Sequence, residues 1–313
     1  MEKKTDMENE KLEMIQDEME PEPLPAGERI PKRKSRFGLI VGALYPVVIH
    51  LILGEGIIWA AYLIPKLTGS SHNIPLQDNI LVLTGLNGLL AGAVLVPLYL
   101  VNQNRRRQDG VIPGDTALGL SFGEGILLLL MGICLSVYTN LLMTLLSNYI
   151  SSESYQAVME AITANNSPLA MLFWVGWIAP MAEEIVFRWM VFLHLRDHLS
   201  LLLSAWVSAI IFGVYHGNVL QAIYASILGV CFALLLEYTG SLISCMLLHI
   251  GANSWSLLLD ISFERAGGSE SFALLEKVAP ILGAAFILLL PVTVWGFHYF
   301  RMKYRMRDRQ RLI

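Results

Sequence analysis

Two adjacent glutamates and an arginine lie in one of the most apolar stretches of the chain, APMAEEIVFRW at 179–189. Even on lenient scales an ionisable side chain at mid-membrane costs about 3 kcal/mol, so such residues need a partner or a chemical task. Glu184 and Arg188 are one helical turn apart and can pair on one face. Glu183 is rotated by about 100° from Glu184 and lacks such a partner. These residues are compatible with either a structural charge network or a reactive carboxylate.

Two histidines occur in other apolar segments of the chain. FGVYHGN places Phe212 and His216 one turn apart, and LLHIGANSW does the same for His249 and Asn253. A single intramembrane histidine is usually a hydrogen-bonded packing residue, but two of them beside an unpaired glutamate favour chemistry. A carboxylate and two imidazoles can hold and deprotonate a water, either through hydrogen bonds or as ligands of a zinc ion. An asparagine amide nearby can donate to the oxyanion that forms when this water attacks a peptide carbonyl.

The elements that must position these residues are membrane helices. Of the 313 residues, 55% are hydrophobic and 15% are charged, whereas soluble proteins have about a quarter charged residues. A spanning helix needs about 20 mainly apolar residues. About eight segments meet this requirement, near 38–64, 79–101, 120–147, 169–193, 200–217, 219–237, 241–260 and 277–300. The sequence therefore predicts an all-α, polytopic bundle in the cell membrane, and nothing in it indicates a nucleic-acid partner.

The distribution of charged and apolar residues divides the chain into four parts and predicts which side of the membrane its loops face. Residues 1–35 are highly charged and contain several prolines, which predicts a disordered tail. Residues 36–168 are expected to hold N-terminal helices and an outer loop, 169–260 the catalytic core, and 261–313 a last helix with a basic tail. Basic residues cluster at 32–36, 105–107, 196 and 301–311, all on one side of an eight-span bundle. Both termini are therefore expected in the cytoplasm.

The ordered trio of motifs resembles the CPBP family of intramembrane proteases, which includes type II CAAX prenyl endopeptidases and bacteriocin-processing or self-immunity proteins. The family pattern is EExxxR, FxxxH and HxxxN on successive core helices, and all three motifs match within about 169–260. The resemblance implies that Glu183 activates the water and that Glu184 and Arg188 support it. His216, His249 and Asn253 would then complete the water-binding and oxyanion site.

The resemblance leaves the metal open, because such proteins are described both as metalloproteases and as glutamate-dependent enzymes. The chain has no HExxH motif, in which two histidines of one helix hold zinc. Glu183, His216 and His249 could nevertheless form an open three-ligand zinc site drawn from three helices. A metal-free site is the alternative. The expected partners are the lipid bilayer and a peptide or lipid-modified protein substrate, of the CAAX type or a leader or bacteriocin peptide.

Two other classes of function compete with a protease. A transporter also places carboxylates and histidines inside its bundle, but usually with broken helices in paired halves, and the sequence shows no such duplication. A non-catalytic scaffold or immunity protein would tolerate other residues at the two histidine positions. We interpret His50 and Glu55, both in the first predicted span, as structural.

The predicted spans place the site residues at unequal depths. Glu183 and His249 fall in the middle to cytoplasmic half, whereas His216 falls toward the outer end of its segment. The sequence therefore predicts that the fifth helix starts later than residue 200 or that the bundle is strongly tilted.

Overall fold

The computed structural model describes residues 36–68, 80–108, 120–163, 166–266, 280–281, 283–284 and 287–303. All the regular secondary structure in these ranges is helical. The predicted disordered tail at 1–35 and the basic segment after residue 303 lie outside the described residues. The helical bundle confirms the fold class that the sequence predicts.

Six helices are long and apolar enough to cross a membrane within the part of the chain that is described. They are α2 (Arg36–Thr68), the Ile80–Val101 part of α3 (Ile80–Gln108), α4 (Phe122–Leu146), the continuous stretch Pro168–Arg196, α10 (Val219–Thr239) and the Leu242–Ser262 part of α11 (Leu242–Ala266). The short helix α5 (Glu153–Thr163) connects α4 to the Pro168–Arg196 stretch. The last predicted span is helical over 287–303, and part of its range lies outside the described residues.

The fifth predicted span is shorter than the sequence suggested. Helix α9 covers Leu201–Tyr215, or 15 residues, and so rises only about 22 Å. The chain turns at Gly217, whose φ of 75° suits glycine, and the side chain of Asn218 accepts from the Gln221 backbone to begin α10. A helix of this length is shorter than a hydrocarbon core about 30 Å thick. His216 directly follows the last residue of this short helix.

The Pro168–Arg196 stretch is not a regular α-helix. Two π-helical segments, η2 (Leu172–Ile178) and η3 (Ile185–Phe192), flank the six-residue helix α7 (Ala179–Glu184). The stretch begins with α6 (Pro168–Met171) and ends with α8 (Leu193–Arg196). π-bulges widen a helix by one residue and occur frequently at functional sites. The two adjacent glutamates close α7 at the start of the second π-segment.

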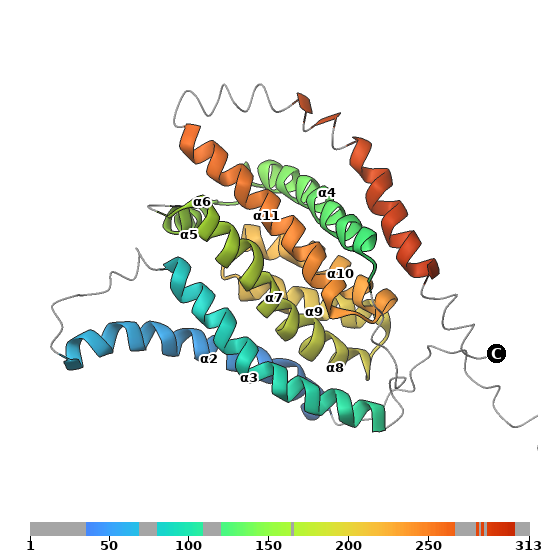
Figure 1. Ribbon diagram of the computed structural model, residues 1–313, viewed down its shortest axis with the longest axis horizontal. Coiled ribbons are helices and arrows are strands. Elements are labelled where there is room, and N and C mark those ends of the chain that lie inside the picture. Colours follow the sequence, from blue (N-terminus) through green and yellow to red (C-terminus); the bar gives the residue numbers. More distant parts are fainter. Residues whose placement is uncertain are drawn as a thin grey trace, which may run out of the picture.

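The α7 segment lies between α3 on one side and α11 on the other, and α4 runs along α11 (Figure 1). Helix α2 packs against α3 and η3. Two glycines allow α4 and α11 to approach closely. A Cβ atom at Gly132 would lie 2.1 Å from the carbonyl oxygen of Leu248, and one at Gly251 would lie 2.3 Å from that of Leu129. The backbones therefore touch directly beside His249, so this contact fixes the position of that residue.

We expect Gly132→Ala to lower the melting temperature and the activity of the protein together. The new methyl group meets backbone atoms, which cannot move aside alone, and overpacking of this kind costs about 1–3 kcal/mol. Gly123→Ala in the same helix is the matched control, since a Cβ there meets nothing within 4 Å. Thermal unfolding in detergent compares the two variants. A Gly132→Ala protein as stable as Gly123→Ala would show that the helices are not in backbone contact.

Candidate active site

Glu184 is the fully buried centre of a charge network. Its Oε1 lies 2.9 Å from Nδ1 of His249, and its Oε2 lies 3.2 Å from Nε of Arg188. An ionised carboxylate only accepts hydrogen bonds, so the Nδ1 atom of His249 carries a proton and donates it to Glu184. In the neutral imidazole the lone pair is then on Nε2. The carboxylate thus sets the tautomer of His249 as well as its orientation.

Arg188 is fully buried and is held mainly by charge and by aromatic faces. Its guanidinium carbon lies 4.5 Å from the ring centroid of Phe212 and 5.0 Å from that of Phe232. The 3.2 Å contact with Glu184 brings opposite charges together but lacks hydrogen-bond geometry, and none of the three guanidinium nitrogens has a hydrogen-bond partner among the described residues. The predicted i,i+4 pair is therefore present as an ion pair between two phenylalanine rings. Cation–π contacts in such a desolvated place contribute about 2 kcal/mol or more.

Glu183 faces the opposite nitrogen of the same imidazole. Its Oε2 lies 3.7 Å from Nε2 of His249, and its side chain keeps 15% of its exposure, whereas Glu184 is fully enclosed. With Nδ1 of His249 protonated, Nε2 and the Glu183 carboxylate are two acceptors that face each other. The structure thus separates the two glutamates as the sequence predicts, one in an ion pair and one beside an accessible ring nitrogen.

His216 is positioned by the helix that it terminates. Its Nδ1 lies 2.9 Å from the carbonyl oxygen of Phe212, which can only accept, so this nitrogen also carries a proton. The Phe212 ring contacts both histidines, with centroid distances of 4.8 Å to His216 and 5.8 Å to His249. Phe212 therefore fixes the tautomer of one histidine and spaces the two rings apart.

Asn253 ties α11 to the irregular part of the Pro168–Arg196 stretch. In the π-register of η2, the Ala179 N–H donates to the carbonyl of Trp174, five residues earlier. The next donor in this register is Pro180, which has no N–H, so the carbonyl of Val175 receives no such bond. The Nδ2 atom of Asn253 donates to it instead, at 3.4 Å. The side chain of Asn253 thus replaces the backbone N–H donor that Pro180 lacks. Asn253 lies one turn after His249 on α11.

Polar residues outside the three motifs also lie within electrostatic range of Glu183. They are His50, Tyr215 and Tyr224. The sequence indicates the place of Tyr215 near the site only through its position directly before His216. His50 comes from α2, far outside the motif region. The sequence favours a structural role for it, because Glu55 in the same span is expected near the outer interface.

The residues predicted as zinc ligands do not form a metal centre as they are placed. No group of three or more His, Cys, Asp or Glu side chains in the described ranges has a geometry that could hold a metal ion. His249 and Glu183 converge, whereas the nearest neighbours of His216 are the ring and carbonyl of Phe212. Zinc stays a prediction from the sequence.

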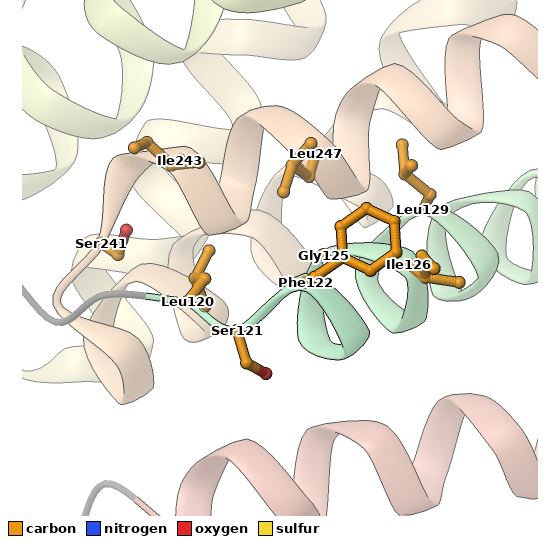
Figure 2. A pocket seen from close by; sticks show the side chains of 9 residues that line it. All are labelled: Leu120, Ser121, Phe122, Gly125, Ile126, Leu129, Ser241, Ile243 and Leu247. Atoms are coloured by element: carbon orange, nitrogen blue, oxygen red, sulfur yellow. The ribbon is translucent and has the colours of Figure 1, made fainter.

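A cavity of about 510 Å³ lies away from this cluster, between the start of α4 and the start of α11. Figure 2 shows its apolar lining, in which Leu247 and Ile243 of α11 face Phe122 and Ile126 of α4. Leu247 precedes His249 by two residues, about 200° around the helix, so the cavity is on the other face of α11. None of the six predicted site residues lines it.

The fold and the site define a polytopic α-helical membrane protein with a charged and histidine-containing centre. Residues 165–255, which include all six predicted site residues, match the family described as type II CAAX prenyl endopeptidase Rce1-like. The chain is also 26% identical over 110 residues to "Putative membrane peptidase YdiL" of Bacillus subtilis (strain 168), a match that covers 35% of this chain and 44% of that protein. No solved structure matches the chain significantly. Both matches confirm the resemblance that the motifs indicate, and the similarity to the family model covers residues 165–255 of this chain.

Proposed function

We propose that the protein is an intramembrane endopeptidase that hydrolyses a peptide bond with water activated by Glu183. The observation that carries this proposal is the placement of one imidazole between two carboxylates. Glu184 holds Nδ1 of His249 at 2.9 Å, so that Nε2 is directed to Glu183, 3.7 Å away. Two acceptors at this separation can each take one hydrogen from the same water molecule.

The chemistry divides the two glutamates between two roles. Glu184 is fully buried and already interacts with Arg188 and His249, so it orients the imidazole and does not exchange protons. Glu183 retains some exposure and accepts a proton from the water as general base. The resulting hydroxide attacks the carbonyl carbon of the peptide bond. When the C–N bond breaks, protonated Glu183 returns its proton to the leaving nitrogen, so the carboxylate is regenerated.

The two histidines contribute according to their tautomers. Neutral His249 accepts from the water at Nε2 and holds it beside Glu183. In neutral His216 the lone pair is likewise on Nε2, since Nδ1 donates to the carbonyl of Phe212. His216 can therefore orient the water or a substrate N–H in its neutral form, and it can donate to an oxyanion as an imidazolium. Asn253 supports the site by holding α11 against η2.

The proposed substrate is a peptide or lipid-modified protein that reaches the site from the bilayer. Both termini of the chain are proposed to lie in the cytoplasm. The test uses purified protein in lipid vesicles with two probes, a transmembrane helical peptide and a peptide with a prenylated C-terminal cysteine. Mass spectrometry then locates any cleaved bond, with and without exhaustive chelation.

Cleavage of either probe by the wild type but not by Glu183→Gln supports the proposal, and the preferred probe indicates the substrate class. Activity that survives chelation supports the metal-free form, whereas zinc-dependent activity returns the metal prediction to the mechanism. Binding of a probe without cleavage would favour a non-catalytic scaffold or immunity protein.

A further inference from the structure

His50 is the polar member of the stripe by which α2 packs on the bundle. Most of α2 is exposed at the bundle surface, and its buried residues before the last turn are Ala43, Pro46, Val47 and His50. These positions recur every three or four residues and therefore share one helix face. His50 is only 3% exposed. An imidazole in this place on a lipid-surrounded helix is costly, so it needs an explanation beyond filling space.

The His50 ring is stacked on a residue next to the catalytic cluster. Its centroid lies 5.3 Å from that of Tyr215, and the ring planes are 17° apart. Tyr215 in turn contacts the ring of His216 edge-on at 6.0 Å. The charge of Glu183 acts on both His50 and Tyr215. A helix outside the matched family region thus brings a third imidazole to the neighbourhood of the proposed base.

Packing explains the ring of His50 but not its nitrogen. The Nδ1 atom is buried and has no hydrogen-bond partner among the described residues. Leaving a buried polar atom unpaired is expensive, and native proteins rarely retain one without a reason. A phenylalanine would make the same stack on Tyr215 without this cost. The Nδ1 atom is therefore able to form a hydrogen bond with a bound molecule.

We propose that His50 is a substrate-binding residue, whose Nδ1 hydrogen-bonds to the backbone of the peptide in the site. This assignment rests on the proposed function, because the ligand is the peptide that Glu183 and His249 cleave. A peptide backbone offers both N–H and C=O groups, so either tautomer of the imidazole finds a partner. α2 packs against η3, which directly follows α7, whereas α11 packs against α7 itself. His50 would accordingly hold the peptide from the side of α2, while His249 acts from the side of α11.

Two substitutions separate the ring of His50 from its nitrogen. His50→Phe keeps the stack on Tyr215 and removes both nitrogens. His50→Asn removes the stack but keeps a hydrogen-bonding atom close to the position of Nδ1. We expect His50→Phe to retain the melting temperature and to lose about tenfold to a hundredfold in kcat/KM, the range for an unpaired group in a bound complex. His50→Asn should lower the melting temperature and keep more of the activity than His50→Phe.

The binding version of the experiment does not require turnover. Each substitution is made in the Glu183→Gln protein, and binding of the fluorescently labelled transmembrane peptide to vesicles is titrated. Weaker binding with His50→Phe than with His50→Asn supports the assignment even if no cleavage is found. The binding assay therefore tests the role of His50, and the cleavage assay separately tests the proposed function. Val47→Ala, one turn earlier on the same stripe, is the control and should reduce stability without changing the affinity. Equal or stronger binding by His50→Phe, relative to His50→Asn, would assign His50 to packing and overturn the proposal.

Discussion

Glu183→Gln should abolish peptide cleavage while the protein keeps its melting temperature. General bases contribute about 10²–10⁴-fold to a rate, and glutamine keeps the size of the side chain but cannot take up the proton of the water. Glu183 retains 15% exposure and has its closest charged contact at 3.7 Å, so neutralising it removes little that stabilises the fold. The kcat/KM of purified protein in vesicles, measured beside thermal unfolding, gives both quantities.

The matched control for this experiment is Glu160→Gln, which neutralises an exposed glutamate of α5. It should leave kcat/KM and the melting temperature unchanged. If Glu183→Gln cleaved the peptide as fast as Glu160→Gln, then Glu183 would have no part in the reaction.

Arg188→Ala has the largest expected effect on stability. Removing one partner of a buried pair leaves the other charge uncompensated, at a cost of about 3–5 kcal/mol. The fully enclosed Glu184 would be left in that position, and the faces of Phe212 and Phe232 would lose the cation that they contact. We expect a strongly lowered melting temperature and a low yield of folded protein.

A second arginine of the chain provides the comparison. Arg196 pairs with Glu237 at 2.9 Å, and their side chains are 14% and 16% exposed. Because solvent reaches this pair, Arg196→Ala should cost less than Arg188→Ala. The double change of Glu184→Gln and Arg188→Met removes both buried charges, so it should recover part of the stability and none of the activity. Equal losses for the two single arginine variants would mean that the Glu184–Arg188 pair is solvated.

The features that the sequence predicts well are those with local causes. The i,i+4 spacing of Glu184 and Arg188 predicts their ion pair, and the rotation of Glu183 predicts its separation from Arg188. Apolar length predicts the spanning helices, because each must satisfy its own backbone in the bilayer. The contact of His249 with the glutamates is not local, and only the family resemblance implies it.

The remaining features depend on contacts between distant segments. The π-register around Pro180 is stabilised in part by Asn253, which is far away in the sequence, so no local pattern indicates it. The early end of α9 follows from Gly217, but apolarity alone extends the predicted span to that residue. His50 reaches Tyr215 only because α2 packs on the bundle, and no local pattern in the sequence indicates this contact.

His216 and His249 are proposed to act with Glu183 in one site, and a double-variant comparison tests this arrangement most directly. Wild type, His216→Ala, His249→Ala and the double variant are assayed for cleavage, bound zinc and thermal unfolding. Residues that work as a unit are non-additive, so each single change should remove nearly all activity and the double variant should be scarcely worse. About one zinc per chain, lost in either single variant, would identify a metalloprotease, whereas full wild-type activity after chelation would identify a glutamate-dependent enzyme. Full activity in either single variant, with stability losses that add as for independent sites, would contradict the shared site.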